Sequence, residues 1–221
     1  MPPLYVLQQG AKLRINNRRL QIEKEDQVLE KIPMVHISQV VLFGNIGLTT
    51  PAINAFLTQG IEVVFLSQRG EYRGRLVGSL TPHVPLRRAQ YERLGQPDFI
   101  LEMAKGFVRA KLSHLRSMLL RHNREIHNPD ISAAVDQIRQ ASDDISRKNS
   151  LNALHGLEGS ATSAYFRAFR YLLSKEWHFE RRARRPPPDP INLLLSFGYT
   201  LLTQLAFSAL QTVGLDPFAG F

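Results

Sequence analysis

The sequence predicts an α+β fold, with a small N-terminal β-rich domain followed by an all-α C-terminal domain. Through about the first 80 residues, apolar residues alternate with polar ones or form short β-branched runs. Pro82 and Pro85 then interrupt this pattern, and beyond them the apolar spacing becomes helical. We therefore expect a β-rich domain at 1–80, a linker at 81–94 that is extended around these two prolines, and a helical domain at 95–221.

The β-rich part is expected to begin with a short strand at 4–7. A hairpin follows, because apolar residues alternate with polar ones around 13–15 and 20–22. Asn16-Asn17 lies between the two stretches and suits a turn that tolerates positive φ. Further strands are expected at 35–37 and 40–43.

The next elements are a short helix and two strands. Thr49 before a first-turn proline, Pro51, predicts a helix start, and Gly60 predicts its end. The apolar run 61–66 has the length and β-branched content of a strand. A last strand is expected at 72–77, with arginines that face either solvent at a sheet edge or a nucleic acid.

The C-terminal part is expected to be helical throughout. Apolar positions recur at helical spacing from Phe99 to His122. Asn128-Pro129-Asp130 ends that helix and caps a second one at 131–145. A third helix is expected around 157–177, with Glu158 at its start, and Asp189-Pro190 opens a fourth.

The fourth helix could be mistaken for a membrane span, because residues 191–213 contain no charged side chain. Its polar residues instead recur every three or four positions and form one stripe. They are Asn192, Ser196, Thr200, Thr203, Gln204, Ser208 and Gln211. We therefore interpret this segment as a helix buried in the core of a water-soluble protein, with its polar face lining a site or an interface and with no membrane as a partner.

Charge and cysteine content limit the function classes. The chain of 221 residues has 28 Lys and Arg against 19 Asp and Glu, a formal net charge of +9. This excess suits a polyanionic partner, although a solvated basic surface is the alternative. Cysteine is absent, which excludes disulfides and thiolate metal sites and fits a cytoplasmic location. The N-terminus lacks the pattern of a signal peptide.

Glu158 is the first candidate site residue, because glycines flank it at positions 156 and 159. The absence of side chains there would let a phosphate or another backbone approach the carboxylate. A glutamate in a first helical turn also has a purely structural explanation, since it opposes the positive end of the helix dipole. The pattern alone leaves both interpretations open.

A basic segment follows on the same predicted helix and in the loop after it. Arginine forks match phosphate oxygens, and Trp177 adds aromatic surface among them. The alternative is a solvated helix end with cations that complement the dipole. We expect phosphate binding close to Glu158, and the candidate DNA-binding residues are Arg167, Arg170, Arg181, Arg182, Arg184 and Arg185.

Several segments occur in the order and spacing of one known family. They are Gly156-Leu157-Glu158-Gly159, Tyr165-Phe166, the run Arg185-Pro186-Pro187-Pro188-Asp189-Pro190-Ile191-Asn192, Ser196-Phe197-Gly198-Tyr199, Gly214-Leu215-Asp216-Pro217 and Gly220-Phe221. Together they resemble the helical domain of the CRISPR adaptation integrase, the CRISPR-associated endonuclease Cas-one (Cas1). The resemblance is strong from about residue 151 to 221 and looser through the β-rich domain.

The resemblance implies that Glu158 is a catalytic metal ligand for Mg²⁺ or Mn²⁺, with Tyr165 and Asn192 in supporting roles. It also implies a histidine and an acidic ligand after Phe221, so the chain would be an apparently C-terminally truncated, incomplete helical catalytic domain. Asp216 falls in the family's Gly-Leu-Asp-Pro turn, and we interpret it as a turn residue. With one carboxylate, this chain is expected to bind metal weakly.

The function implied by the resemblance is metal-dependent joining of DNA 3′-hydroxyls into the CRISPR repeat, with DNase activity at the same site. The implied partners are double-stranded DNA, a second copy of the chain in a homodimer built through the β-rich domain, and the adaptation subunit Cas-two (Cas2). The alternative is a catalytically incomplete, DNA-binding structural subunit or a fragment of that integrase.

Overall fold

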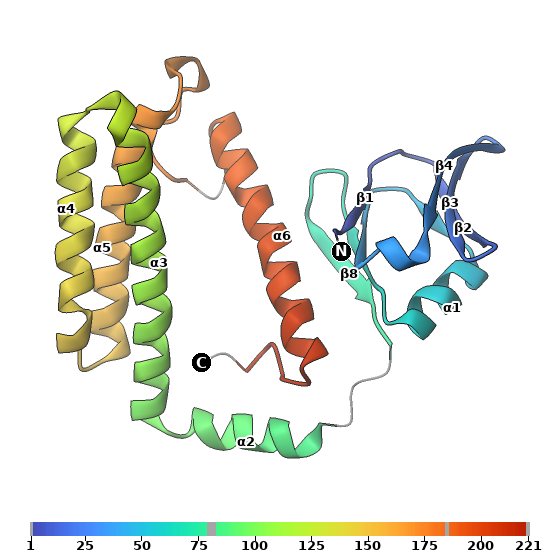
Figure 1. Ribbon diagram of the computed structural model, residues 1–221, viewed down its shortest axis with the longest axis horizontal. Helices are drawn as coiled ribbons and strands as arrows, with labels where there is room; N and C mark the ends of the chain where they lie inside the picture. The colour runs from blue at the N-terminus through green and yellow to red at the C-terminus, as the bar shows by residue number, and fades with distance from the viewer. Residues whose placement is uncertain (1, 79–82, 184–185, 220–221) are drawn as a thin grey trace. The chain divides into compact units, whose positions relative to one another are not determined.

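The computed structural model describes residues 2–78, 83–183 and 186–219 (Figure 1). The chain divides into two compact units. The first comprises Met1–Pro82 together with Phe197–Gly214, and the second comprises His83–Ser196 together with Leu215–Phe221. The α+β class predicted from the sequence is confirmed, since the strands of the described residues lie between Leu4 and Leu76 and the elements after them are helices.

The first unit contains a mixed sheet in the order β1-β5-β7-β8. Strands β1 (Leu4–Val6), β5 (Gln39–Phe43) and β7 (Glu62–Leu66) run parallel, and β8 (Tyr72–Leu76) pairs antiparallel with β7. All five residues of β5 are buried, as expected for a central parallel strand covered on both faces. The sequence therefore placed all four strands of this sheet correctly.

A second sheet has the order β4-β3-β2-β6. Strands β2 (Lys12–Asn16) and β3 (Arg19–Lys24) form the predicted hairpin, and β6 (Gly47–Leu48) pairs with β2. The turn residues are Asn17 and Arg18, with φ of 48° and 60°, one position later than expected. Two successive positive φ values are the signature of the turn whose twist matches paired strands.

Strand β4 (Gln27–Pro33) was not foreseen. It pairs antiparallel with β3, but its first five residues are exposed, so it has no alternation of buried and exposed positions to reveal it. The strand expected at 35–37 is wrong, because Met34–His36 forms a short 3₁₀ helix. Pro33 immediately before it cannot donate a backbone hydrogen bond, which favours the end of a strand there.

Helix α1 (Thr50–Gln59) has both predicted ends. The Thr49 side chain accepts a hydrogen bond from the amide of Ala52, and Gly60 closes the helix at φ 67°. Phe56 on this helix is fully buried and packs with Leu13, Leu20 and Val63 in the core of the unit.

Helix α2 (Val84–Leu94) occupies most of the segment expected to be a linker. The extended conformation expected around the two prolines is wrong from Val84 onward, because Pro85 lies in the first turn of the helix, where a backbone N–H has no partner within the helix. Residues 79–82, which include the start of the expected linker, lie outside the described residues.

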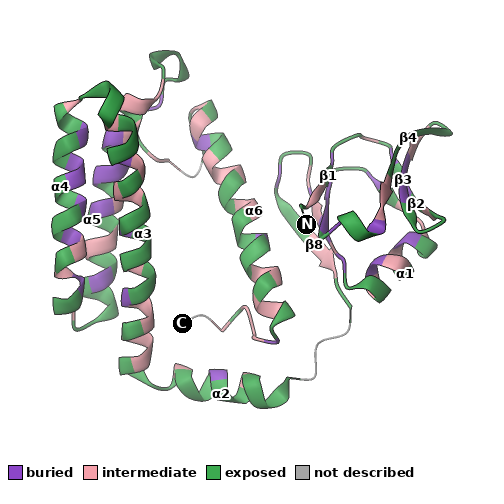
Figure 2. Ribbon diagram, in the orientation of Figure 1, coloured by how far each residue is buried: buried purple, intermediate pink, exposed green. Residues whose placement is uncertain are grey.

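Three helices form the body of the second unit, and they lie side by side in Figure 1. They are α3 (Pro97–Ile126), α4 (Pro129–Asp144) and α5 (Leu151–Phe169). Their core contains Leu112 and Leu119 of α3, Ile138 of α4 and Leu154 of α5, all at most 2% exposed. Figure 2 shows buried residues on the facing sides of α4 and α5. Asn128 caps α4 as predicted, through the amides of Asp130 and Ile131.

Helix α6 (Pro190–Thr212) begins in the second unit, and from Phe197 onward it belongs to the first. The sequence assigned residues 197–214 to the helical domain, whereas the structure groups them with the β-rich part. Phe197 and Leu201 pack against the apolar cluster of Val41, Phe43 and Val64, which explains the grouping. Whether 1–80 and 95–221 fold as independent domains stays a prediction.

The polar stripe of α6 contacts a buried arginine of β8. The Arg75 guanidinium pairs with Glu62 at 2.8 Å, donates to Gln204 and Gln211 at 2.9 and 3.3 Å, and lies over the Phe207 ring at 3.5 Å. The side chains of Arg75 and Glu62 are only 9% and 11% exposed. Arg75 therefore faces neither solvent nor nucleic acid, and both interpretations of this strand's arginines are wrong for it.

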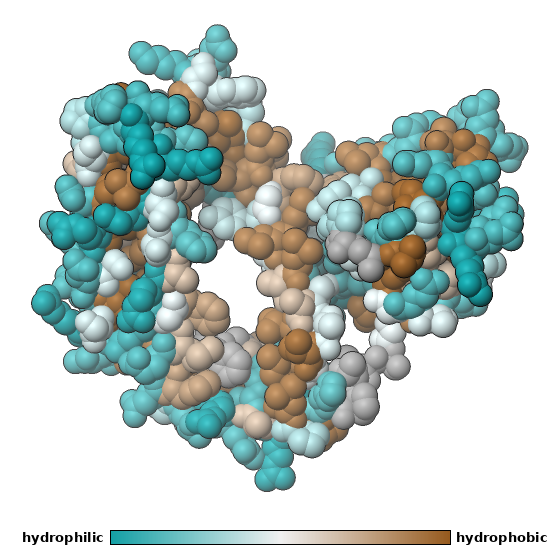
Figure 3. All heavy atoms as spheres, in the orientation of Figure 1, coloured by the Kyte–Doolittle hydropathy of each residue, from teal (hydrophilic) through white to brown (hydrophobic). Residues whose placement is uncertain are grey.

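By length and composition, α6 is also the one described helix that is apolar enough to cross a membrane, which is weak evidence taken alone. Apolar side chains are exposed along it, and they appear as a brown surface in Figure 3. They are Leu193, Leu194, Tyr199, Leu202 and Leu205. Asn192 and Gln204 of the same helix are buried in contact with protein groups, but only 6% of its most apolar 18-residue stretch is buried. The expectation of a helix buried in the core is therefore wrong for most of α6.

Candidate functional site

Glu158 lies in the third turn of α5, not at the start of a helix as the sequence suggested. Ser150 caps this helix by accepting a hydrogen bond from the amide of Ala153, so the helix begins at Leu151. The dipole at a helix N-terminus acts within the first turn, so it does not explain a glutamate at position 158. Gly156 and Gly159 are exposed, with open space where a Cβ would project. The space beside Glu158 that the flanking glycines were expected to leave for a ligand is therefore open.

The carboxylate of Glu158 is held by two side chains. Lys111 of α3 donates to Oε1 of Glu158, and Thr162, one turn along α5, donates to the same oxygen at 2.9 Å. The Glu158 side chain is 18% exposed and that of Lys111 is 40% exposed. The acid is thus positioned by its neighbours, yet solvent still reaches it.

The surroundings of Glu158 keep it ionised. Partial burial by itself raises the pKa of the carboxyl. The hydrogen bonds from Lys111 and Thr162 and the positive charges of Lys111 and His155 oppose burial and outweigh it, so the pKa is below its ordinary value. A half-buried carboxylate that remains charged at neutral pH can accept a cation or a proton donor.

Tyr165, the predicted supporting residue, is two turns beyond Glu158 on the same helix. Its ring is buried and stacks on Phe169 at 5.7 Å, and its hydroxyl donates to Sδ of Met118 on α3 at 3.1 Å. These contacts fix the α3–α5 packing behind Glu158. Contact with a phenyl ring and a thioether indicates a packing role for Tyr165.

Arg167 and Arg170 lie on a different face of α5 from Glu158. They line an open pocket of about 240 Å³ together with Asp130 and Gln137 of α4, whereas Glu158 faces Lys111 of α3. Nine helical residues separate Glu158 from Arg167, which is about 13 Å along the axis and about half a turn around it. The predicted cluster of these two arginines around the carboxylate is therefore not what the structure shows.

Arg182 binds the protein itself. Its guanidinium donates to Oδ1 of Asn192 at 2.9 Å and to Oγ of Ser196 at 3.0 Å. The Arg182 fork thus joins the preceding loop to the first turns of α6. The structure gives Arg182 this intramolecular role, and its expected phosphate contact stays a prediction. Arg181 is exposed, and Arg184 and Arg185 lie outside the described residues.

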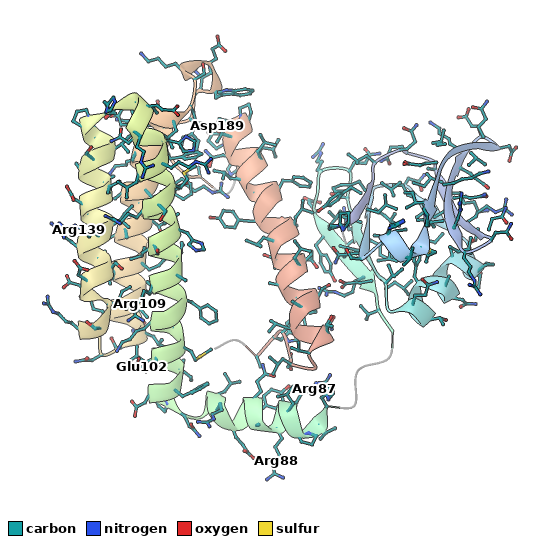
Figure 4. The ribbon with its side chains drawn as sticks, viewed as in Figure 1. Arg87, Arg88, Glu102, Arg109, Arg139 and Asp189 are labelled. Carbon is teal, nitrogen blue, oxygen red and sulfur yellow. The ribbon has the colours of Figure 1, made fainter. Side chains whose placement is uncertain are left out.

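Asn192 is fully buried and makes bonds with both ends of its amide. Nδ2 donates to the carbonyl of Arg181 and to Asp189, and Oδ1 accepts from Arg182 and from the amide of Ala183. Asp189, labelled at the start of α6 in Figure 4, also accepts from the amide of Asn192 at 2.8 Å, which confirms it as the predicted cap. Asn192 therefore fixes residues 181–183 against α6.

The metal-ligand set is incomplete within the described residues, which contain no group of three or more His, Cys, Asp or Glu placed to hold an ion. Asp216 is a turn residue as expected, since it accepts from the amide of Phe218 at 2.8 Å and from the hydroxyl of Tyr91. The hydrogen bond from Tyr91 is the main cause that lowers the pKa of Asp216. A divalent ion prefers several oxygen or imidazole ligands, and Glu158 with His155 alone does not satisfy it.

Sequence reasoning missed Lys111. It lies one position before the core residue Leu112, among the residues with which α3 packs on α5. A charged residue beside a helix packing face was a weak signal, because lysines often lie along such faces with their ammonium groups in water. Only the pairing of α3 with α5 identifies Glu158 as its partner.

Comparison with known proteins supplies the family. A family model described as "CRISPR associated protein Cas1" matches residues 4–221. The "CRISPR-associated endonuclease Cas1 2" of Rhodospirillum rubrum is 36% identical over 99% of this chain and 66% of its own length. The Moorella thermoacetica "CRISPR-associated endonuclease Cas1 1" is 32% identical with the same coverage. A Geobacter sulfurreducens "CRISPR-associated exonuclease Cas4/endonuclease Cas1 fusion" is 36% identical, and 41% of it is covered.

Solved structures agree with this assignment. A chain of a "Cas6-RT-Cas1--Cas2 complex" is 28% identical and superposes with a TM-score of 0.79 over 97% of this chain and 24% of that one. The Cas1 protein TM1797 from Thermotoga maritima, 23% identical, shares the fold with a TM-score of 0.81 over the whole chain and 69% of its own. The present chain spans between 41% and 66% of the length of the three curated relatives named above. The chain belongs to the CRISPR-associated Cas1 family.

Proposed function

We propose that the chain acts in CRISPR adaptation, as the Cas1 integrase and endonuclease that joins DNA 3′-hydroxyls into the repeat. The observation that carries the proposal is the family match over 4–221, with relatives named endonucleases that are 32% and 36% identical over nearly the whole chain. Because the chain covers only 66% of the length of each of those relatives, their activity is proposed for this polypeptide and is not assigned to it on similarity alone.

Glu158 is the proposed catalytic carboxylate and metal ligand, with Mg²⁺ or Mn²⁺ as the proposed cofactor. When bound, such an ion would stabilise negative charge on a phosphate. The described donor set is incomplete, so we expect weak binding of either ion by this chain. Calorimetric titration with Mn²⁺ checks this expectation, and tight stoichiometric uptake by the 221-residue chain would contradict it.

Double-stranded DNA is the proposed substrate and partner. Arg167, Arg170 and Arg181 are the proposed phosphate contacts; all three are exposed, which supports the proposal, although Arg170 also donates to the hydroxyl of Tyr171 at 2.7 Å. Replacing all three with glutamine should weaken duplex binding and lower the salt slope by about 0.9 for each phosphate that is no longer neutralised. Arg139 of α4, which belongs to another charged cluster with Asp136 and Asp143, provides the matched control.

We also propose that the chain forms a homodimer through its β-rich part, binds a Cas2 subunit and works in the cytoplasm. Support for the Cas2 partner comes from the name of the similar complex, which contains both proteins. Light scattering of the purified chain measures the dimer, and co-purification with a Cas2 subunit from the same CRISPR locus measures the second interaction. A monomer at all concentrations would contradict the first part.

A strand-transfer assay tests the activity directly. The wild-type chain and the E158Q variant are incubated with a short duplex, a repeat-containing plasmid and Mn²⁺, with the longer Moorella relative as a positive control. Integration or cleavage by the wild-type chain, abolished in E158Q, is the expected result. If E158Q retains wild-type activity, Glu158 is not the catalytic carboxylate.

A second candidate function is a DNA-binding structural subunit with an incomplete catalytic site. The specific observation in its favour is that Lys111 binds Glu158 while the described residues contain no cluster of metal ligands. In that case the chain binds duplex DNA with a clear salt dependence but produces no strand transfer under conditions in which the Moorella relative does.

A further inference from the structure

A pocket of about 240 Å³, which we call the α4–α5 pocket, lies where these two helices pack. Its inner wall includes Ala134 of α4 and Ala164 and Ala168 of α5, all of which are buried. Because these side chains end at Cβ, they leave a hollow between the helices that longer side chains would fill. The volume is below the range of about 300–1,000 Å³ that is typical of pockets for drug-sized ligands. The α4–α5 pocket therefore suits a small group and not a large cofactor.

Two guanidinium groups line the same pocket. Arg167 lies near the end of α5, and Arg170 lies in the 3₁₀ helix η3 (Arg170–Leu172) that follows it. Arg167 donates to Oγ of Ser163 at 3.1 Å. Arg170 donates to the hydroxyl of Tyr171 at 2.7 Å and lies over its ring, 4.7 Å from the centroid. Each of these bonds orients a guanidinium group while using one of its five N–H donors.

The charges on the lining favour an anion. Asp130 is the acid among the described residues that line the pocket, and together with Glu180 it attracts the Arg170 guanidinium. The two arginines still outnumber Asp130 on the lining, and Gln137 of α4 adds a neutral amide. A ligand with negative charge and several acceptor oxygens would therefore complement this surface.

We propose that the α4–α5 pocket binds a terminal phosphate group, such as the 5′-phosphate at the end of a DNA strand. A phosphomonoester carries a charge of roughly −1.5 to −2 and three acceptor oxygens, which two arginine forks can share. A phosphodiester inside a strand carries less charge and has a sugar on each side, so it fits a small pocket between two helices less well. The DNA source of the phosphate rests on the DNA-binding role proposed above.

The phosphate in this pocket is not the one that reacts. Arg167 and Glu158 lie on different faces of α5, about 13 Å apart along its axis and about half a turn apart around it. One phosphate group cannot contact both side chains across that distance. The α4–α5 pocket is thus a second contact for DNA, which recognises how a strand ends.

The main test compares two duplexes that differ only in whether their 5′ ends carry a phosphate or a hydroxyl. Fluorescence anisotropy measures the Kd of each duplex for the full chain, and the readout is the ratio of the two Kd values. The ratio cancels a general loss of attraction between the protein and the DNA backbone, because that loss weakens both duplexes alike.

Three variants probe the charge and the shape of the pocket. R167Q/R170Q removes both cations, whereas A133M keeps them and fills space, because Ala133 is an exposed residue of the lining. R139Q is the matched control. Arg139, labelled on α4 in Figure 4, is also an exposed cation, and it lies two positions after Gln137, which places it on another side of the helix.

Wild type and R139Q should bind the phosphorylated duplex about tenfold more tightly than the hydroxyl duplex, as expected for hydrogen bonds between charged groups. In R167Q/R170Q and A133M the ratio should fall to about twofold or less. Circular dichroism establishes that each variant is folded. If the double variant does not fold, R167Q and R170Q decide the matter singly, each with a reduced ratio.

A second arm distinguishes a DNA end from a free phosphate compound. Phosphorus NMR follows the binding of thymidine 5′-monophosphate and of inorganic phosphate to wild type and to R167Q/R170Q. If both compounds bind only weakly while the duplex ratio is high, the phosphate of a DNA end is the ligand. If the nucleotide binds through the two arginines and the duplex ratio is near one, the phosphate site stands and its DNA source is overturned.

The remaining outcomes separate this inference from the DNA-binding proposal. Duplex binding with a ratio near one, and no nucleotide or phosphate bound, would overturn the pocket and leave the DNA partner in place. A high ratio that persists in R167Q/R170Q or in A133M would place the phosphate outside the pocket and overturn the inference. If neither duplex binds wild type, the DNA partner is overturned, and the NMR titrations alone decide whether the pocket binds phosphate.

Discussion

The ion pairs Arg75–Glu62 and Lys111–Glu158 each join two secondary-structure elements, and they differ in what surrounds them. Arg75–Glu62 is almost completely buried, and its charges are further bonded by Gln204, Gln211 and Gln39. Lys111–Glu158 is partly exposed and has Thr162 as its additional partner. The first pair is enclosed and fixed, whereas the second leaves a charged carboxylate that another ion can reach. Both acids have a cationic partner, so the degree of burial is what distinguishes Glu62, a structural acid, from Glu158, a candidate functional acid.

The largest expected effect comes from breaking the enclosed pair. R75M leaves Glu62 buried and bonded by the amide of Gln39 but without the Arg75 cation, so the free energy of unfolding should fall by about 3 kcal/mol. Urea denaturation measures this loss. The double variant R75M/E62Q should recover much of the stability, because it buries no unpaired charge. Equal losses in the single and double variants would show that the charge balance at this site is unimportant.

N192A should have the next largest effect. The Asn192 amide is fully buried, and its removal takes a partner from Asp189, Arg182 and two backbone groups. We expect the free energy of unfolding to fall by about 2 kcal/mol, mainly through unsatisfied buried groups. Urea denaturation and proteolysis of the loop at 181–183 provide the measurements. Unchanged stability would mean that the loop is not fixed by this side chain.

The partly exposed pair Lys111–Glu158 should make a small, pH-dependent contribution to the free energy of unfolding. Because the pKa of Glu158 is lower in the folded state than in the unfolded chain, the carboxylate adds stability above the unfolded value of about 4.3. That contribution disappears as the pH falls through the lower, folded-state pKa. Wild type should exceed E158Q by about 1 kcal/mol at pH 7 and by nothing at the acid end of a urea series. A constant difference across the series would contradict the lowered pKa.

Replacing Gly159 with alanine should give the smallest change in stability, and it should change stability and DNA binding in opposite directions. An alanine there fits open space inside α5, so G159A should raise the free energy of unfolding by about 0.5–1 kcal/mol. The added methyl also stands beside Glu158, where a phosphate would approach. Thermal denaturation and duplex binding together test both effects. Higher stability with unchanged binding would show that the glycine serves no ligand.

Much of the fold could be predicted because it depends on local patterns. Thr49 and Gly60 bounded α1, Asn128 capped α4 and Asp189 capped α6, since each cap is made by residues close in sequence. Strand β4 escaped prediction because its side chains are mostly exposed and give no alternation. The start of α5 was misplaced because Ser150, its cap, was not recognised as one.

The candidate site was predicted only in part. The glycines around Glu158 and the family motifs identified the candidate carboxylate from neighbouring residues. Its partner Lys111 is 47 positions away, and Arg182 was assigned to DNA although it binds Asn192 and Ser196. The number of arginines in a segment does not show whether a guanidinium group points into solvent or binds other groups of the protein. The outcome depends on which elements pack beside each arginine in the folded chain.

The amino-acid sequence alone determined the fold class, most helix and strand positions, the basic charge and the Cas1 family, because these follow from local propensity, periodicity and motif order. Only the tertiary structure decided which charges meet. The packing of α3 on α5 gave Glu158 its lysine, and the contact of β8 with α6 buried Arg75. Hydrogen bonds between side chains and the burial of charged groups depend on residues that folding brings together from separate segments. The spatial distances between those residues cannot be deduced from the order of residues along the chain.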